Sequence, residues 1–95
     1  MEIKRNLDGK FAISPEGVVF KISNGEPIPD DEPLFLFRAR DLLALDALLR
    51  YKDVSAGAGC NAYHFEKLDG AIRQFEKFKA AHPERMKQPS VTRGL

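Results

Sequence analysis

The sequence has one cysteine, no tryptophan and no long apolar run. A lone cysteine, Cys60, cannot form a disulfide within the chain, and sparse cysteine use is typical of the reducing cytosol. No stretch approaches the roughly 20 apolar residues of a membrane span. The opening residues MEIKRNLDGK lack the apolar core of a secretory signal. We therefore expect a soluble cytoplasmic protein.

Excess charge of one sign is also missing. The chain has 15 Lys or Arg against 14 Asp or Glu, which gives a net charge of +1. Nonspecific nucleic-acid binding needs a basic stripe, because each phosphate contact requires a cation. Attraction to an anionic membrane surface needs a similar excess. We expect neither DNA, RNA nor a membrane as the partner.

The hydrophobic fraction, by contrast, is sufficient for a core. It amounts to 43% of 95 residues, which predicts one globular domain over residues 1–95. A domain of this size buries only about 60–65% of the surface of its unfolded chain. Small domains often complete their burial by self-association, so the composition favours a homo-oligomer.

Turn signals divide the first 38 residues into short strands. Asp8-Gly9 and Asn24-Gly25 tolerate positive φ, and Pro15 presets φ for a further turn. The expected strands are EIKRN, FAIS, VVFKIS and LFLFR, the last at residues 34–38. The acidic, proline-rich segment EPIPDDEP precedes that last strand and is expected to be a loop or an edge segment.

Helical periodicity begins at Asp41. The segment DLLALDALLRYK is rich in strong helix formers, and DVSAGAG after it breaks the pattern. Its expected apolar stripe consists of Leu42, Leu45, Leu48 and Leu49.

A second, longer helix follows the glycine-rich segment. We expect it to begin at a cap on Asn61 and to end before Pro83, because the residue before proline disfavours the α conformation. Its expected apolar stripe consists of Phe65, Leu68, Ile72, Phe75 and Phe78.

These patterns predict an α+β fold. A small antiparallel β-meander of three to four strands (1–38) precedes a helical pair (39–82) and an extended tail (83–95). Two helices cover one face of such a sheet, which makes two layers.

The apolar segment at residues 34–38 raises the question of what covers the other face of the sheet. In a strand, Leu34 and Leu36 point to one side, and Phe35 and Phe37 to the other. A partner subunit on Phe35 and Phe37 is one answer, and cover by the N-terminal hairpin or the tail is another. Gly70 in the second helix allows close approach of another backbone, such as a helix of a neighbouring subunit.

Arg38, Arg40 and Asp41 lie where this strand gives way to a helix. Guanidinium groups beside a helix N-terminus bind phosphate or carboxylate, so an anionic ligand is one interpretation. Pairing of the arginines with surface acids is the other, and it is the commoner arrangement. If an anion binds, Tyr51 or Tyr63 is a candidate to stack on a base, and Thr92 and Arg93 of the tail are candidates to complete the pocket.

Neither a metal site nor an active site is indicated. Cys60, His64 and His82 have no further cysteine or clustered carboxylate to complete a tetrahedral metal site. Cys60 and His64 also lack a group that would orient them as a nucleophile and base. The segment SAGAGCN (residues 55–61) follows a helix and lacks the P-loop Lys-Ser/Thr, so it is expected to be an interhelix turn. We expect a non-enzymatic protein without a cofactor.

Two segments resemble small accessory proteins of tailed phages and prophages. These are DDEPLFLFRARDLLALDALLRYK and GAIRQFEKFKAAHPERMKQP. The resemblance implies action against bacterial immunity in the host cytoplasm. The first hypothesis is an oligomer that sequesters a small phosphorylated nucleotide signal. Alternatives are a protein-binding inhibitor, similar to anti-CRISPR proteins, that docks by the acidic loop PDDE (29–32) or an apolar sheet face, and a small structural phage protein.

Overall fold

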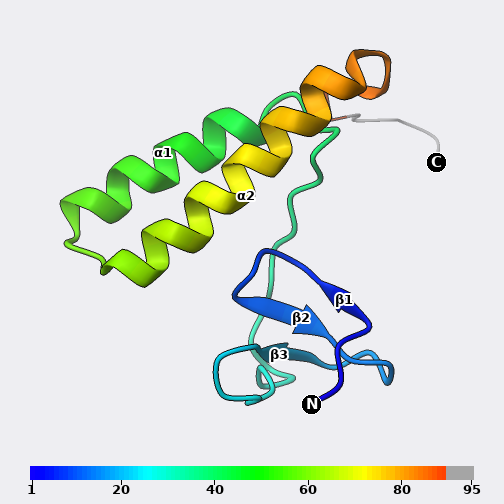
Figure 1. The fold of residues 1–95 in the computed structure, drawn as a ribbon, viewed down its shortest axis with the longest axis vertical. Coiled ribbons are helices and arrows are strands. Elements are labelled where there is room, and N and C mark those ends of the chain that lie inside the picture. Colours follow the sequence, from blue (N-terminus) through cyan, green and yellow to red (C-terminus); the bar gives the residue numbers. More distant parts are fainter. Residues whose placement is uncertain (90–95) are drawn as a thin grey trace. The chain divides into compact units, whose positions relative to one another are not determined.

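The computed structural model describes residues 1–89 of the chain. The chain divides into two compact units, the sheet unit Met1–Phe35 and the helical unit Leu36–Leu95. Figure 1 shows the strands of the first unit and the helices of the second. The single domain predicted from the length stays a prediction, and each unit is described by itself below.

The sheet unit contains a three-stranded antiparallel sheet in the order β1-β2-β3. The strands are β1 (Arg5–Asn6), β2 (Phe11–Ile13) and β3 (Val19–Lys21). Ala12 of β2 lies opposite Phe20 of β3, and both side chains are buried. Residues directly opposite each other on neighbouring strands point to the same face of the sheet, so this pair forms the centre of the small core.

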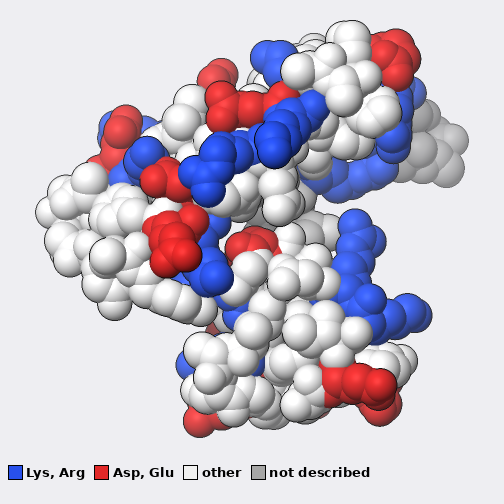
Figure 2. Space-filling view, viewed as in Figure 1, with Lys and Arg blue, Asp and Glu red and all other residues white. Residues whose placement is uncertain are grey.

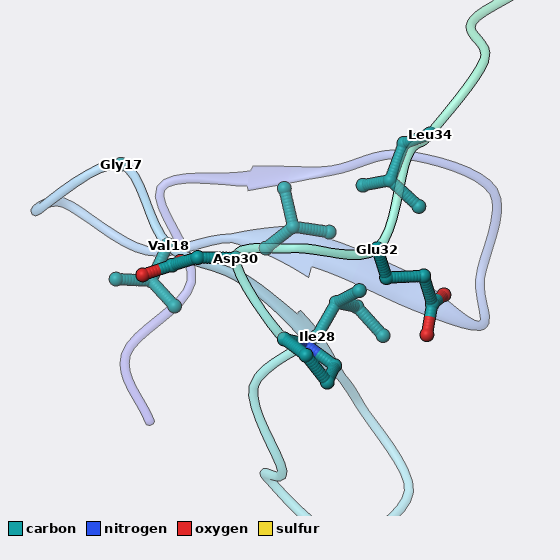
Figure 3. A pocket seen from close by; sticks show the side chains of 8 residues that line it. Gly17, Val18, Ile28, Asp30, Glu32 and Leu34 are labelled. Carbon is teal, nitrogen blue, oxygen red and sulfur yellow. The ribbon is translucent and has the colours of Figure 1, made fainter.

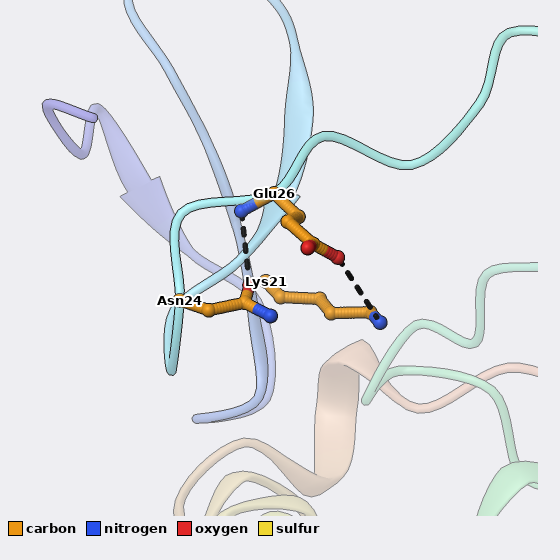
Figure 4. Close-up of polar contacts among 3 residues, drawn as sticks. All are labelled: Lys21, Asn24 and Glu26. Atoms are coloured by element: carbon orange, nitrogen blue, oxygen red, sulfur yellow. Dashed lines mark hydrogen bonds and ion pairs between the residues drawn. The ribbon is translucent and has the colours of Figure 1, made fainter.

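The turns form where the sequence predicted them. The Asp8 carboxylate accepts hydrogen bonds from the backbone N–H groups of Lys10 and Phe11, and Gly9 has φ +86°. After β3, the Asn24 side chain accepts from the N–H of Glu26 at 2.9 Å (Figure 4). Local side-chain bonds of this kind favour turns over continued strands.

The predicted strand at residues 34–38 is wrong. These residues form no ladder in the structure and carry the chain from one unit into the next. The free edge of β3 is already used by the proline-rich segment, since Pro27 pairs with Phe20 and the N–H of Ile28 donates to the carbonyl of Val19. This segment is the predicted edge element, and it leaves no edge of β3 for a further strand.

The helical unit is a hairpin of two helices, α1 (Ala44–Gly57) and α2 (Ala62–Ala81). Its buried side chains come from both helices and are Ala44, Ser55, Leu68 and Ile72. Two of the four are small, which lets the helix backbones approach each other closely. The sheet followed by two helices confirms the α+β class, whereas packing of the helices on the sheet stays a prediction.

The apolar stripe predicted for the first helix is only partly correct. Leu42 lies before α1 and is 44% exposed, and Leu49 is 47% exposed, whereas Leu45 and Leu48 are half-buried. The helix also begins three residues later than predicted and continues to Gly57. The buried residues of α1 are Ala44 and Ser55, and Ser55 Oγ lies 2.9 Å from His64 Nε2 of α2. In the second helix, the predicted stripe is confirmed at Leu68 and Ile72.

A glycine closes the first helix and an asparagine opens the second. The N–H of Gly59 donates to the carbonyl of Ala56, and the N–H of Cys60 donates to that of Ser55. With φ +73° at Gly59, this is a Schellman motif. The Asn61 side chain then accepts from the N–H of His64 at 3.0 Å, as the predicted N-cap requires. The predicted interhelix turn is confirmed at residues 58–61, whereas residues 55–57 belong to α1, and the amides of Gly59 and Cys60 bond to helix carbonyls.

Replacement of Gly59 and of Gly57 by alanine should change the stability of the protein in opposite directions. Gly59→Ala forces a residue with a side chain into positive φ and should lower the free energy of unfolding by about 1 kcal/mol or more. Gly57 is the last residue of α1 and has no positive φ, and a Cβ at this position would meet no atom within 4 Å. Gly57→Ala should therefore raise the free energy of unfolding, by up to about 1 kcal/mol.

Urea unfolding followed by circular dichroism at 222 nm measures both changes. Destabilisation of the same size in both variants would show that the turn does not depend on the conformation of Gly59.

Candidate functional site

The chain after α2 returns to the arginine-containing segment. A short 3-10 helix, η1 (Pro83–Arg85), reverses the direction of the chain at the start of the predicted extended tail, and Met86 after it is extended. The N–H of Lys87 then donates to the carbonyl of Arg40 at 2.8 Å, and the N–H of Leu42 donates to the carbonyl of Lys87 at 2.9 Å. We call this parallel pairing of residues 40–42 with Lys87 the clasp. It fastens the start of α1 to the segment that follows α2.

The clasp explains the position of the predicted anion-binding residues. Arg38 begins a turn in which its carbonyl accepts from the N–H of Asp41. The Asp41 carboxylate accepts from the N–H of Leu43 at 2.8 Å, immediately before α1. A negative charge at this end of a helix is favourable. The carboxylate of Asp41 thus supplies the negative charge that an external anion was expected to bring.

The two candidate stacking residues lie away from the arginines. Tyr51 is two turns into α1, roughly 10 Å along the helix from Ala44 at 1.5 Å per residue. Tyr63 lies at the start of α2, beyond the far end of α1, which is roughly 20 Å long. The structure therefore does not bring Tyr63 together with Arg38 and Arg40. Tyr63 instead lies beneath the ammonium group of Lys67, 5.6 Å from the ring centroid.

A polar contact that the sequence did not reveal joins the helices. His64 Nε2 lies 2.9 Å from Ser55 Oγ, and the His64 ring meets Tyr51 edge-on with centroids 5.6 Å apart. Ser55 is only 3% exposed, so its hydroxyl is not accessible as a nucleophile. Lys52 and Asp69 add an ion pair of 2.8 Å between the helices. These contacts fix the register of the hairpin and hold Tyr51 in place.

One side of α1 carries large, exposed apolar side chains. Tyr51 and Val54 lie within α1, and Leu43 is its N-cap with helical φ and ψ. Their spacings of eight and three residues place them on one side of the helix. Their exposed fractions are 53%, 53% and 54%. We call these three residues the Tyr51 flank. Leu49, which is 47% exposed, lies on the opposite side of the helix, and Leu42 precedes it.

The residues predicted to form an oligomer interface are Phe35, Phe37 and Gly70. Phe35 and Phe37 are 84% and 37% exposed, but the sheet face on which they were placed does not exist. Apart from its own helix turn, a Cβ on Gly70 would meet only Arg73 Nη2, at 3.9 Å, so no backbone of another described segment approaches it closely. The role of these three residues in an interface stays a prediction. Thr92 and Arg93 lie outside the described residues.

The two units have net charges of opposite sign. The sheet unit has four Lys or Arg against seven Asp or Glu, a net charge of −3, whereas residues 36–95 have eleven against seven, a net charge of +4. In the helical unit, basic and acidic side chains are interspersed on the face that Figure 2 shows. The nearly neutral chain therefore joins an acidic unit to a basic one.

Within residues 1–89, no group of three or more His, Cys, Asp or Glu side chains is arranged to hold a metal ion. Neither described helix combines the length and the apolar composition that crossing a bilayer requires.

Comparisons with protein-family models, curated proteins and solved structures found no match to this chain. The resemblance to phage accessory proteins therefore stays a prediction.

Two substitutions at one position separate the backbone of the clasp from its charge. Lys87→Pro removes the N–H that donates to Arg40, and Met86, with φ −71° and ψ 134°, already has the conformation that a following proline requires. We expect this variant to lose about 1 kcal/mol of stability and to speed hydrogen exchange at the Leu42 amide.

Lys87→Ala keeps both backbone bonds and is the matched control. Its Leu42 amide should exchange as in the original protein, measured by NMR. Unchanged exchange in Lys87→Pro would contradict the clasp.

Proposed function

We propose that this protein acts without catalysis, by binding another protein through the Tyr51 flank. The observation that carries the proposal is the exposure of Leu43, Tyr51 and Val54 on one side of α1, in a unit that fully buries only four side chains among its described residues. Contiguous apolar surface on a small protein marks a site of interaction. An amphipathic helix or an apolar patch of the partner would cover it.

The local geometry supports a preformed binding surface. Tyr51 packs edge-on against His64, which in turn contacts buried Ser55. A rigid aromatic residue among apolar neighbours resembles the centre of a typical protein interface, since tyrosine buries a large area at low cost in side-chain entropy. The resemblance to phage proteins places components of bacterial defence systems first among partners to test.

Matched substitutions on the two sides of α1 test this proposal. Val54→Glu places a charge on the Tyr51 flank, whereas Leu49→Glu places one at a similarly exposed position on the other side. Both variants should stay helical, because neither side chain is buried. We expect Val54→Glu to weaken binding of the partner at least tenfold and Leu49→Glu to change it little.

The partner is first identified by cross-linking and quantitative mass spectrometry in host lysate, and is then purified for calorimetry. Equal affinities for the original protein and Val54→Glu would overturn the role of the flank. Loss of binding in Leu49→Glu alone would assign the interface to the other side.

Sequestration of a phosphorylated nucleotide is the second candidate. One observation favours it: the clasp leads the C-terminal segment back to Arg40, so the chain that continues to Thr92 and Arg93 starts beside the predicted arginines. Four basic residues, Arg38, Arg40, Arg85 and Lys87, belong to the clasp or lie within two residues of it. Guanidinium groups are suited to forked contacts with phosphate oxygens.

Native mass spectrometry with a panel of cyclic and ADP-ribose-type nucleotides tests this candidate. If it is correct, a stoichiometric adduct forms, and Arg38→Ala/Arg40→Ala weakens it at least tenfold. The ligand should be recovered intact after heat denaturation. The absence of an adduct across the panel would contradict sequestration, and recovery of a cleaved ligand would show an enzyme.

A further inference from the structure

A groove in the sheet unit has a chemistry distinct from that of the clasp and of the Tyr51 flank. It has a volume of about 240 Å³. Its lining comes from the turn before β3, from β3 itself and from the segment after it (Figure 3). The lining residues are Gly17, Val18, Val19, Ile28, Pro29, Asp30, Glu32 and Leu34. We call it the sheet groove.

Hydrogen bonds hold both walls of the groove in place. On one wall, the buried Ser14 hydroxyl accepts from the N–H of Val18 at 3.1 Å, and Gly17 closes the turn with φ +86°. On the other, the N–H of Ile28 donates to the carbonyl of Val19, and the N–H of Glu32 donates to that of Pro29. The groove is therefore formed before any ligand arrives, which reduces the entropy lost on binding.

The lining combines apolar side chains with two carboxylates. Val18, Val19, Ile28 and Leu34 supply the apolar part, and Leu34 is 59% exposed. Neither the Asp30 nor the Glu32 carboxylate has a hydrogen-bond or ion-pair partner within residues 1–89. An ion pair of this unit joins Lys21 to Glu26 at 3.8 Å, outside the groove (Figure 4). In Figure 3, Asp30 and Glu32 lie on opposite sides of the apolar side chains.

The chemistry of the groove narrows the class of ligand. Two carboxylates without a cation in the lining repel phosphate and other anions. Within residues 1–89 no group of three or more metal-ligating side chains occurs, and the apolar side chains of the lining favour an organic cation. The volume is below the roughly 300 Å³ at which pockets for small molecules begin, so it suits one side chain. Arginine and lysine carry a cation on an aliphatic stem, which matches carboxylates around an apolar floor.

We propose that the sheet groove binds an arginine or lysine side chain of a partner protein, with the stem on Ile28 and Leu34 and the cation at Glu32, while Asp30 on the opposite side adds to the negative potential of the groove. The net charge of −3 on the sheet unit draws a basic segment toward it. The groove lies in the sheet unit and the Tyr51 flank in the helical unit, so this proposal is tested separately from the proposed function.

The test is an NMR titration of the full chain with Nα-acetyl-arginine amide. Nα-acetyl-citrulline amide is the matched probe, since it has nearly the same shape without the charge. We expect arginine to bind with millimolar affinity, shifting the amide signals of Gly17, Val18 and Val19, and citrulline to bind at least fivefold more weakly. Raising the salt concentration to 0.5 M should weaken the arginine response, because exposed charges are screened.

Two double variants with the same change in net charge separate the groove from general attraction. Asp30→Asn/Glu32→Gln should weaken arginine binding at least fivefold, whereas Glu2→Gln/Glu16→Gln, outside the groove, should leave it within twofold. Equal shifts with arginine and citrulline would overturn the proposal. So would equal losses in the two double variants, because attraction would then depend on net charge alone.

Discussion

The contact between α1 and α2 is the constraint on which the helical unit depends. The packing of these two helices against each other buries one line of residues, which consists of Ala44, Ser55, Leu68 and Ile72. Small residues in the line bring the backbones close, and the bond between Ser55 and His64 fixes their register. The large apolar residues of α1 are consequently placed on its sides. The exposure of the Tyr51 flank follows from the same packing that forms the hairpin.

Hairpins this small are marginally stable, because short helices gain most of their stability from packing. The Schellman motif at Gly59, the cap at Asn61 and the clasp at Lys87 each satisfy backbone groups at the helix ends. They add stability without covering the flank. An apolar surface that remains open after these local devices are in place is the observation on which the proposed function rests.

Local chemistry could be predicted from the sequence, and contacts between distant segments could not. Asp8-Gly9, Asn24-Gly25, Asn61 and Pro83 act on their immediate neighbours, and each produces the predicted turn or helix end. The run at residues 34–38 was mistaken for a strand, because a short apolar segment looks the same whether it is buried in a sheet or joins two units. The clasp was missed because it pairs residues some 45 positions apart. Ser55 was missed because burial of its hydroxyl depends on His64 of the other helix.

The structure agrees with only part of the candidate site predicted from the sequence. Arg38, Arg40 and Asp41 were predicted from their place before a helix, and that place is confirmed, although Asp41 itself supplies the negative charge there. Tyr63 proved too far along the hairpin to join them. The sequence indicates the acidic loop at residues 29–32 as a docking element. Its position beside an apolar groove could not be predicted, because it results from the pairing of residues 26–28 with β3.

Methyl cross-saturation NMR on the complex with the purified partner tests the central claim most directly, because it reports which side chains the partner covers. The account predicts saturation transfer to the methyl groups of Leu43 and Val54, and little to those of Leu42 and Leu49. Transfer restricted to Leu42 and Leu49, or to methyl groups of the sheet unit alone, would contradict it.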